Sequence, residues 1–180
     1  MLSPDAHQRA RRIELILMDV DGVLTDGQIL LLTDAQGGVR ELKGFDVSDG
    51  VGITFVHRVG LRTGIITGRR SESVAARAKE LGMEIVEEGT WQKLETYEKV
   101  RAAVQLDDSR IAYIGDDLQD LPLLRRVGFA VAPANAQPEV KAVCHMVTEK
   151  PGGRGAVREA LDFILRAQGK WEKILERYRA

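Results

Sequence analysis

Short apolar runs alternate with segments of helical period along this chain of 180 residues, which is the pattern of a parallel sheet covered by helices. The strands predicted from the apolar runs cover residues 13–18, 62–67, 84–87, 110–114, 129–132 and 145–148. The helices predicted between them cover residues 49–59, 71–81, 91–105, 118–126, 138–143 and 155–168, and the helical pattern resumes at Trp171. We therefore expect one α/β domain over residues 1–180, with a C-terminal helical tail over about 155–180.

An insertion over residues 27–44 follows the first strand and is predicted to be a β-hairpin, with strands at 28–33 and 38–43 around a glycine-containing turn. Its first strand is apolar at four successive positions, Ile29 to Leu32, so both of its faces need cover. A lone hairpin cannot supply that cover. The hairpin therefore either folds onto its own domain or pairs with other copies of the chain, and avoidance of exposed apolar patches favours a homo-oligomer.

The composition is that of a globular protein and limits the partners and metal sites that can be expected. Hydrophobic residues make up 44% and charged residues 29%, as in globular proteins, and the net charge of −1 predicts neither nucleic acid nor an anionic membrane as a partner. Cys144 is the only cysteine and the three histidines are widely spaced, so we expect any metal to be bound by oxygen. The apolar run at 13–18 is far shorter than the roughly 20 residues of a membrane span. A cytoplasmic protein is expected.

Two carboxylates stand at the end of the first predicted strand, in Asp19-Val-Asp21-Gly22. The carboxyl ends of strands line the ligand crevice of an open α/β sheet, and residues i and i+2 of an extended chain point to the same side. Crowded carboxylates need a compensating charge, which Mg²⁺ supplies because it prefers oxygen ligands. A solvated polar turn is the plainer interpretation of this motif taken alone.

The strand at 110–114 ends in a second acidic cluster, which contains Asp116, Asp117 and Asp120. Metal ligation from two loops requires such a second cluster, so Asp116 is expected to complete the site while Asp117 or Asp120 orients a ligand water. Charge complementarity to a helix N-terminus explains Asp117 and Asp120 equally well.

Thr67 and Lys93 are the other candidates at this edge of the sheet. Thr67 ends the strand at 62–67, where a hydroxyl and the following amides suit an anionic oxygen. Lys93, near the start of a predicted helix, offers a compact cation for an acid pair and a phosphate. Taken singly, β-propensity explains the threonine and a solvated helix surface explains the lysine.

The ordered set of Asp-x-Asp, Thr, Lys and Gly-Asp-Asp resembles the haloacid dehalogenase superfamily of aspartate-nucleophile phosphatases. Longer segments resemble its 3-deoxy-D-manno-octulosonate (KDO) 8-phosphate phosphatases over roughly residues 13–168; they are 19–27, 45–53, 66–69, 113–117 and 152–159. The resemblance implies a Rossmann-like three-layer fold with a central parallel sheet, no large cap and a small hairpin insertion. It also implies a homotetramer, in which hairpins combine and neighbouring subunits complete each active site.

The same resemblance implies Mg²⁺-dependent hydrolysis of KDO 8-phosphate through an aspartyl phosphate, a step in the synthesis of KDO for lipopolysaccharide. Asp19 is expected to be the nucleophile and Asp21 the acid and base that also contacts the substrate. The implied metal ligands are Asp19, Asp116 and the Asp21 backbone carbonyl. Thr67, Lys93 and the amides of residues 20–22 are expected to bind the phosphate oxygens.

Arg69 and Arg154 are candidates for the substrate carboxylate or phosphate, because guanidinium matches these groups in a fork; either is otherwise a surface arginine. Arg154 lies in the segment 151–155, which its glycines predict to be the most flexible part of the chain and which resembles the family's mobile tail.

Two departures from the family pattern put sugar specificity in question. Ser48 stands where the family often has an arginine, and Gln92 precedes Lys93, after an unusual Trp91, where the family has asparagine. The alternatives are therefore a phosphatase of a related nine-carbon acid sugar, an enzyme for another phosphate ester, or a non-catalytic oligomerisation module of the same fold. A receiver domain also combines acids, Thr and Lys, but it carries the phosphorylated aspartate after its third strand, whereas here Asp-x-Asp comes first.

Overall fold

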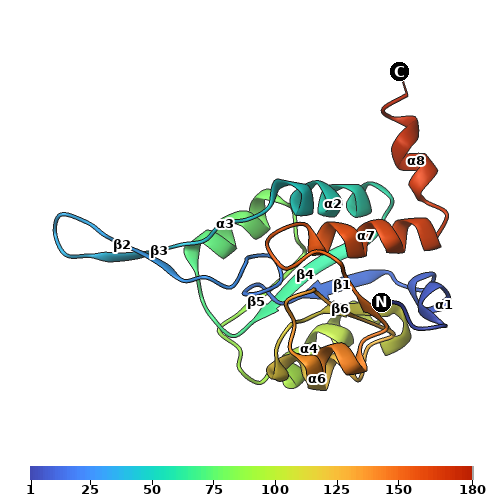
Figure 1. Cartoon of the computed structure of the whole chain (residues 1–180), viewed down its shortest axis with the longest axis horizontal. Helices are drawn as coiled ribbons and strands as arrows, with labels where there is room; N and C mark the ends of the chain where they lie inside the picture. The colour runs from blue at the N-terminus through green and yellow to red at the C-terminus, as the bar shows by residue number, and fades with distance from the viewer. Residues whose placement is uncertain (180) are drawn as a thin grey trace.

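A six-stranded parallel sheet forms the centre of the molecule in the computed structural model, which describes residues 1–179 (Figure 1). The strand order is β5-β4-β1-β6-β7-β8. The strands are β1 Leu15–Met18, β4 Arg62–Thr67, β5 Ile85–Glu88, β6 Ile111–Ile114, β7 Phe129–Ala132 and β8 Met146–Val147. The α/β class and the central parallel sheet predicted from the sequence are confirmed.

The central strands are buried on both faces, which explains their continuous apolar sequence. All four residues of β1, and likewise of β6 and β7, are buried. Met18 at the end of β1 pairs with Ile65 of β4 on one side and with Ile114 of β6 on the other. The chain segments that follow β1, β4 and β6 therefore leave the sheet at one edge, where they are neighbours.

Helices cover both faces of the sheet (Figure 1). One core contains residues of α1 Ala6–Ala10, α2 Val47–Arg58, α3 Glu72–Glu80, α7 Ala156–Ala167 and α8 Trp171–Glu176. The other core contains residues of α4 Lys93–Val104, α5 Leu121–Leu124 and α6 Pro138–Val143. Helix α7 buries the apolar face that its sequence predicts, including Val157, Leu161 and Ile164. Within residues 1–179 no helix is long and apolar enough to cross a membrane.

The predicted hairpin is present as β2 Leu30–Thr33 and β3 Val39–Leu42, an antiparallel pair that projects from the body of the molecule (Figure 1). Every residue of β2 is exposed, and the Leu31 side chain is 66% exposed. The alternative in which the hairpin folds onto its own domain is therefore wrong for the single chain.

Several local details differ from the sequence predictions. Helix α1 was not expected; its Ala6 and Ala10 are buried, but the polar residues around them hid the pattern. Residues 118–126 form a 3₁₀ turn, Leu118–Asp120, followed by the short α5, because the Asp117 side chain accepts from the Leu118 amide and caps the turn. The C-terminal tail contains two helices, α7 and α8.

The glycine-rich segment 151–155, predicted to be the most flexible part of the chain, packs against the loop that follows β1. The Gly152 amide donates to Asn135 Oδ1 (2.6 Å), and the Gly153 amide donates to the Val23 carbonyl (3.0 Å). A Cβ on Gly152 would lie 1.9 Å from the Gly22 carbonyl oxygen. Glycine is required here because two backbones meet.

Candidate active site

A buried ion pair joins the end of β1 to the start of α4. Asp19, the first residue after β1, is 2% exposed, and its Oδ2 lies 2.7 Å from Lys93 Nζ. Lys93 is also 2% exposed although it is the first residue of its helix. Burial by itself lowers the pKa of Lys93, but the carboxylates of Asp19 and Asp120 outweigh burial and raise it. The lysine is therefore a fixed positive charge beside Asp19.

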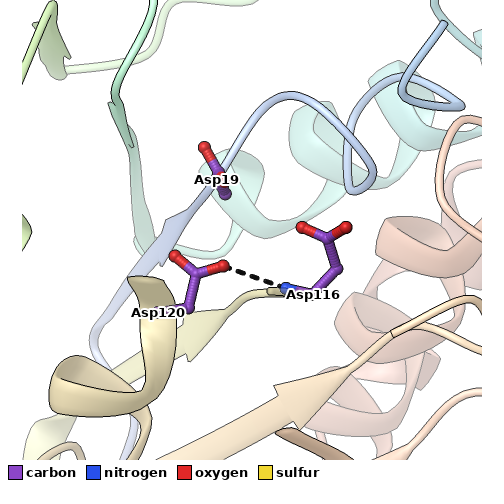
Figure 2. A group of neighbouring side chains, drawn as sticks. All are labelled: Asp19, Asp116 and Asp120. Atoms are coloured by element: carbon purple, nitrogen blue, oxygen red, sulfur yellow. Dashed lines mark hydrogen bonds between the residues drawn. The ribbon is translucent and has the colours of Figure 1, made fainter. Parts of the chain in front are cut away.

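Asp120 holds this ammonium from the other side. It is completely buried, and its Oδ1 accepts from Lys93 Nζ (2.7 Å) and from the Tyr113 hydroxyl (2.8 Å). Its Oδ2 accepts from the Asp116 amide at 3.0 Å (Figure 2) and from the Asp117 amide at 3.3 Å. Protein donors thus occupy both oxygens of Asp120. This arrangement positions Lys93 and the loop that carries Asp116, a role that the sequence analysis did not assign.

Asp19, Asp116 and Asp120 form the one carboxylate cluster of metal-binding geometry within residues 1–179, with ligand oxygens within 4.8 Å of one another (Figure 2). Asp116 Oδ1 is buried and has no hydrogen-bond partner among the described residues. Burial raises the pKa of Asp19 to about 6, against the effect of Lys93; burial and the neighbouring carboxylates Asp120 and Asp19 raise the pKa of Asp116 to about 7. An orphaned oxygen among repelling carboxylates fits Mg²⁺, which proteins bind through one or two carboxylates with the remaining positions left to water and phosphate.

The loop after β1 packs directly on the Asp116 carboxylate. Gly22 has φ +86°, and a Cβ there would lie 2.0 Å from Asp116 Oδ2. The Val20 amide donates to Asp19 Oδ1 (2.7 Å), whereas the amides of Asp21 and Gly22 donate no hydrogen bond within the described chain. Two unused backbone donors next to a carboxylate cluster suit an anionic oxygen.

The Asp21 side chain is not a member of this cluster and contacts Lys43 at the base of the hairpin. Its Oδ1 accepts from Lys43 Nζ and lies 3.4 Å from Thr25 Oγ1, and its Oδ2 lies 3.5 Å from Arg69 Nε. Lys43, just after β3, was not among the residues singled out from the sequence. A charged residue at the base of an exposed hairpin carries no local signal of such a contact, which depends on how the chain folds back.

Thr67 and Trp91 lie along the same edge of the sheet. Thr67 ends β4, is 3% exposed, and lies two residues beyond the partner of Met18. Trp91 is 71% exposed, and its ring lies close to Gly68, since a Cβ on Gly68 would be 3.3 Å from Trp91 Cε3. The departure at Trp91 thus adds an exposed aromatic surface beside Thr67.

The two candidate arginines occupy different surroundings. Arg69, with a 41% exposed side chain, pairs with Glu41 of β3 as well as with Asp21. Arg154 is 67% exposed and lies 3.4 Å from Asp26 Oδ2. Ser48 donates to Asp46 Oδ1 (2.6 Å) at the N-terminus of α2, and a Cβ on Gly155 would lie 3.4 Å from Ser48 Oγ. The departure at Ser48 therefore lies against the segment that carries Arg154.

Comparison with known proteins gives concordant matches. Residues 70–161 match the model of the haloacid dehalogenase-like hydrolases. The chain is 44% identical to the 3-deoxy-D-manno-octulosonate 8-phosphate phosphatase KdsC of Yersinia pestis over 171 residues, which cover 95% of this chain and 89% of the relative.

Solved structures agree with this match. The phosphatase of the same name from Moraxella catarrhalis, solved in complex with magnesium, phosphate and KDO, is similar with a TM-score of 0.91 and 39% identity, covering 97% of this chain and 98% of that one. The cobalt-bound deoxy-D-mannose-octulosonate 8-phosphate phosphatase from Haemophilus influenzae is similar with a TM-score of 0.83 and 37% identity, covering 91% and 93%.

Proposed function

The chain belongs to the haloacid dehalogenase-like hydrolases and, within them, to the 3-deoxy-D-manno-octulosonate 8-phosphate phosphatases, so it is a hydrolase of phosphoric monoesters. We propose that it releases phosphate from KDO 8-phosphate in a Mg²⁺-dependent reaction. The observation that carries the proposal is the arrangement of buried Asp19 and Lys93 with half-buried Asp116 at one sheet edge. A relative that is 39% identical over almost its whole length was solved with magnesium, phosphate and KDO bound.

Asp19 is the nucleophile of the proposed reaction. Its carboxylate attacks phosphorus in line, the bond from phosphorus to the sugar oxygen breaks, and an aspartyl phosphate forms that water then hydrolyses. Burial disfavours the charged form of Asp19, so a carboxylate there is poorly solvated and is held in place by Lys93. Asp19, Asp116 and the Asp21 carbonyl would hold the Mg²⁺. When bound, this ion neutralises charge on the attacking carboxylate and on the phosphate.

The phosphate oxygens meet fixed donors. Thr67 offers its hydroxyl, Lys93 its ammonium, and Asp21 and Gly22 their amides. Donors that are already oriented stabilise the charge that develops in the transition state without reorganising, which is commonly the largest contribution to catalysis. Asp120 acts here through Lys93, whose position it fixes.

Asp21 is the acid and the base. It gives a proton to the departing sugar oxygen in the first step and takes one from the attacking water in the second, a role worth about 10²- to 10⁴-fold. Asp21 is only partly buried and lies two residues after Asp19 in the chain, which suits a group that exchanges protons with bound molecules.

The sugar acid itself is recognised by arginines, and the active unit is an oligomer. Arg69 and Arg154 supply guanidinium groups for the carboxylate of KDO. The exposed apolar residues of β2 pack against hairpins of other copies, which assembles a tetramer. The contacts of Arg69 with Asp21 (3.5 Å) and of Arg154 with Asp26 (3.4 Å), in the loop after β1, support this role.

The test is phosphate release from a panel that contains KDO 8-phosphate, a nine-carbon acid sugar 9-phosphate and neutral sugar phosphates, with Mg²⁺ or EDTA. KDO 8-phosphate should have the highest kcat/KM, and EDTA should abolish turnover. Asp19→Asn should abolish turnover while the circular dichroism spectrum is kept. Robust turnover by Asp19→Asn excludes the covalent route, and preference for the nine-carbon substrate replaces the proposed sugar.

A further inference from the structure

Asn135 connects two segments that are far apart in the sequence. Its Nδ2 donates to the Gly22 carbonyl (2.9 Å), in the loop that follows β1, and its Oδ1 accepts from the Gly152 amide (2.6 Å), in the glycine-rich segment 151–155. Both glycines are buried, whereas Asn135 is exposed, so a surface side chain bonds two buried backbone groups. The proposed chemistry gives this side chain no role.

The loop that carries Asn135, residues 133–137 between β7 and α6, is fixed through its own backbone. The Gln137 amide donates to the Asp116 carbonyl (2.9 Å), and the Ala134 amide donates to the Lys150 carbonyl (3.1 Å). The loop is therefore bonded both to a residue of the carboxylate cluster and to the residue that precedes the glycine-rich segment. Asn135 starts from a fixed position.

The place of Gly152 depends on Asn135. The Asn135 Oδ1 is the one acceptor that the Gly152 amide has within residues 1–179. A buried amide that loses its acceptor costs free energy, so removal of the Asn135 side chain favours a segment that moves off the loop into water. Arg154, two residues further on, has a 67% exposed side chain and contacts Asp26 at 3.4 Å, and an exposed ion pair of this kind holds a segment only weakly.

From this geometry we propose that Asn135 is a positioning residue for recognition of the sugar acid: by bonding Gly152, it holds Arg154 against the loop after β1, where the guanidinium meets the substrate carboxylate. The inference rests on the proposed role of Arg154. A binding-competent position that is only partly populated lowers the apparent affinity by that fraction, so loss of the two bonds weakens binding of the sugar acid. Asn135 makes no hydrogen bond to Asp19 or Lys93 within residues 1–179, so turnover of bound substrate is kept.

Asn135→Ala should therefore affect KM and not kcat. For KDO 8-phosphate we expect KM to rise about 3- to 10-fold while kcat stays within about 2-fold of wild type. 4-Nitrophenyl phosphate has no carboxylate for Arg154, so its KM should change less than about 2-fold. In an Arg154→Ala background, Asn135→Ala should raise KM for KDO 8-phosphate by less than about 2-fold, because residues that act as a unit are not additive. A general distortion of the site would change KM for both substrates alike.

Trypsin gives a second readout that needs no substrate. It cleaves after arginine where the chain opens locally, so cleavage after Arg154 reports release of the segment. Mass spectrometry of the fragment 1–154 should show cleavage at least about 10-fold faster in Asn135→Ala than in wild type, since the cleavage rate follows the population of the open form. Arg154→Ala should not yield this fragment, which verifies the site of cleavage.

Gln168→Ala is the matched control. It also removes a side-chain amide that bonds two backbone groups, the carbonyls of Ala10 (3.0 Å) and Ile13 (2.7 Å). Ile13 precedes β1, at the opposite end of that strand from Asp19. Gln168→Ala should match wild type in KM for both substrates and in cleavage after Arg154. Thermal unfolding by circular dichroism verifies that each variant is folded.

Unchanged cleavage after Arg154 in Asn135→Ala overturns the positioning of the segment. An unchanged KM for KDO 8-phosphate, or an equal rise of KM on both substrates, overturns the role in recognition. A failure of the proposed substrate is distinguishable from these results. If wild type prefers another acid sugar phosphate, that ester replaces KDO 8-phosphate and the expected contrast is unchanged; if it prefers an ester without a carboxylate, the role in recognition is overturned whatever the rate of cleavage.

Discussion

Lys93 Nζ lies 2.7 Å from Asp19 Oδ2, and both side chains are almost completely excluded from solvent. Asp120 lies at the same distance from the ammonium, so one cation serves two carboxylates. Neither carboxylate could remain charged at this depth without the lysine. The pair is therefore expected to stabilise the folded state as well as to serve the proposed chemistry.

Lys93→Met is expected to lower both the turnover and the stability of the folded protein. Turnover should fall by at least about 10²-fold, as when one donor to a developing charge is removed. The free energy of unfolding at pH 8 should fall by about 3–5 kcal/mol, because two buried carboxylates lose their partner. Urea unfolding measures this loss, which should be smaller at pH 5.5 because Asp19, with a pKa raised to about 6 by burial, is then largely protonated. The exposed Lys99→Met is the matched control, and a loss that is the same at both pH values counts against the charge argument.

Stability without metal should depend on pH through Asp116. Its pKa, raised to about 7 by burial, Asp120 and Asp19, exceeds the value of about 4 in the unfolded chain. The folded protein then binds more protons than the unfolded chain between pH 4 and 7, so this group adds stability as the pH falls from 8 to 5. Mg²⁺ favours the charged form, so its stabilising effect should be largest at pH 8 and fade toward pH 5.

Other groups titrate in the same pH range, so the effect of Asp116 is measured as the difference in unfolding free energy between wild type and Asp116→Asn. Burial raises the pKa of Asp49 to about 6 and adds the same sign, while burial lowers the pKa values of His57 and His145 and adds the opposite sign. Urea unfolding of wild type and Asp116→Asn in EDTA, from pH 5 to 8, isolates the one carboxyl. Parallel curves for the two proteins would show that Asp116 is not the source.

The parts of the fold that could be predicted from the sequence are those with a local residue pattern. The strands were predictable because β1, β6 and β7 are buried on both faces and read as unbroken apolar runs. The candidate acids followed from one rule, that residues after parallel strands share an edge, and this rule brought Asp19 and Asp116 to one cluster.

The missed contacts are those that depend on convergence of distant segments. The Tyr113 hydroxyl bond to Asp120 needs the 3₁₀ turn after β6, and the Lys43 bond to Asp21 needs the hairpin to leave and return. Neither residue differs locally from an ordinary strand tyrosine or surface lysine. The close approach of Gly152 to the Gly22 carbonyl was also missed, because sequence alone does not distinguish a glycine that makes room for another backbone from a glycine in a flexible loop.

The exposed hairpin should determine assembly. Leu32 of β2 is 54% exposed and pairs with Arg40 of β3. Leu32→Asp places a charge within the apolar surface, and we expect monomers in size-exclusion chromatography with light scattering where wild type is oligomeric. Val86→Asp, a 40% exposed residue of β5, adds the same charge elsewhere and should leave the assembly intact. Oligomers that survive Leu32→Asp, or a monomeric wild type, rule out assembly through β2.

Gly22→Ala tests whether the close approach of the β1 loop to Asp116 is needed for metal-dependent activity. The new Cβ would lie 2.0 Å from Asp116 Oδ2, so the carboxylate or the loop must move. Gly60→Ala is the matched control, because Gly60 has nearly the same positive φ, +81° against +86°, with no atom within 4 Å of the added carbon. Both variants bear the strain of a left-handed alanine, about 1–2 kcal/mol in the free energy of unfolding. Only Gly22→Ala should raise the Mg²⁺ concentration needed for half-maximal activity, at least about 10-fold, since a 1.4 kcal/mol loss of metal binding suffices for that change. If the two variants require the same Mg²⁺ concentration, the contact between Gly22 and Asp116 does not shape the metal site.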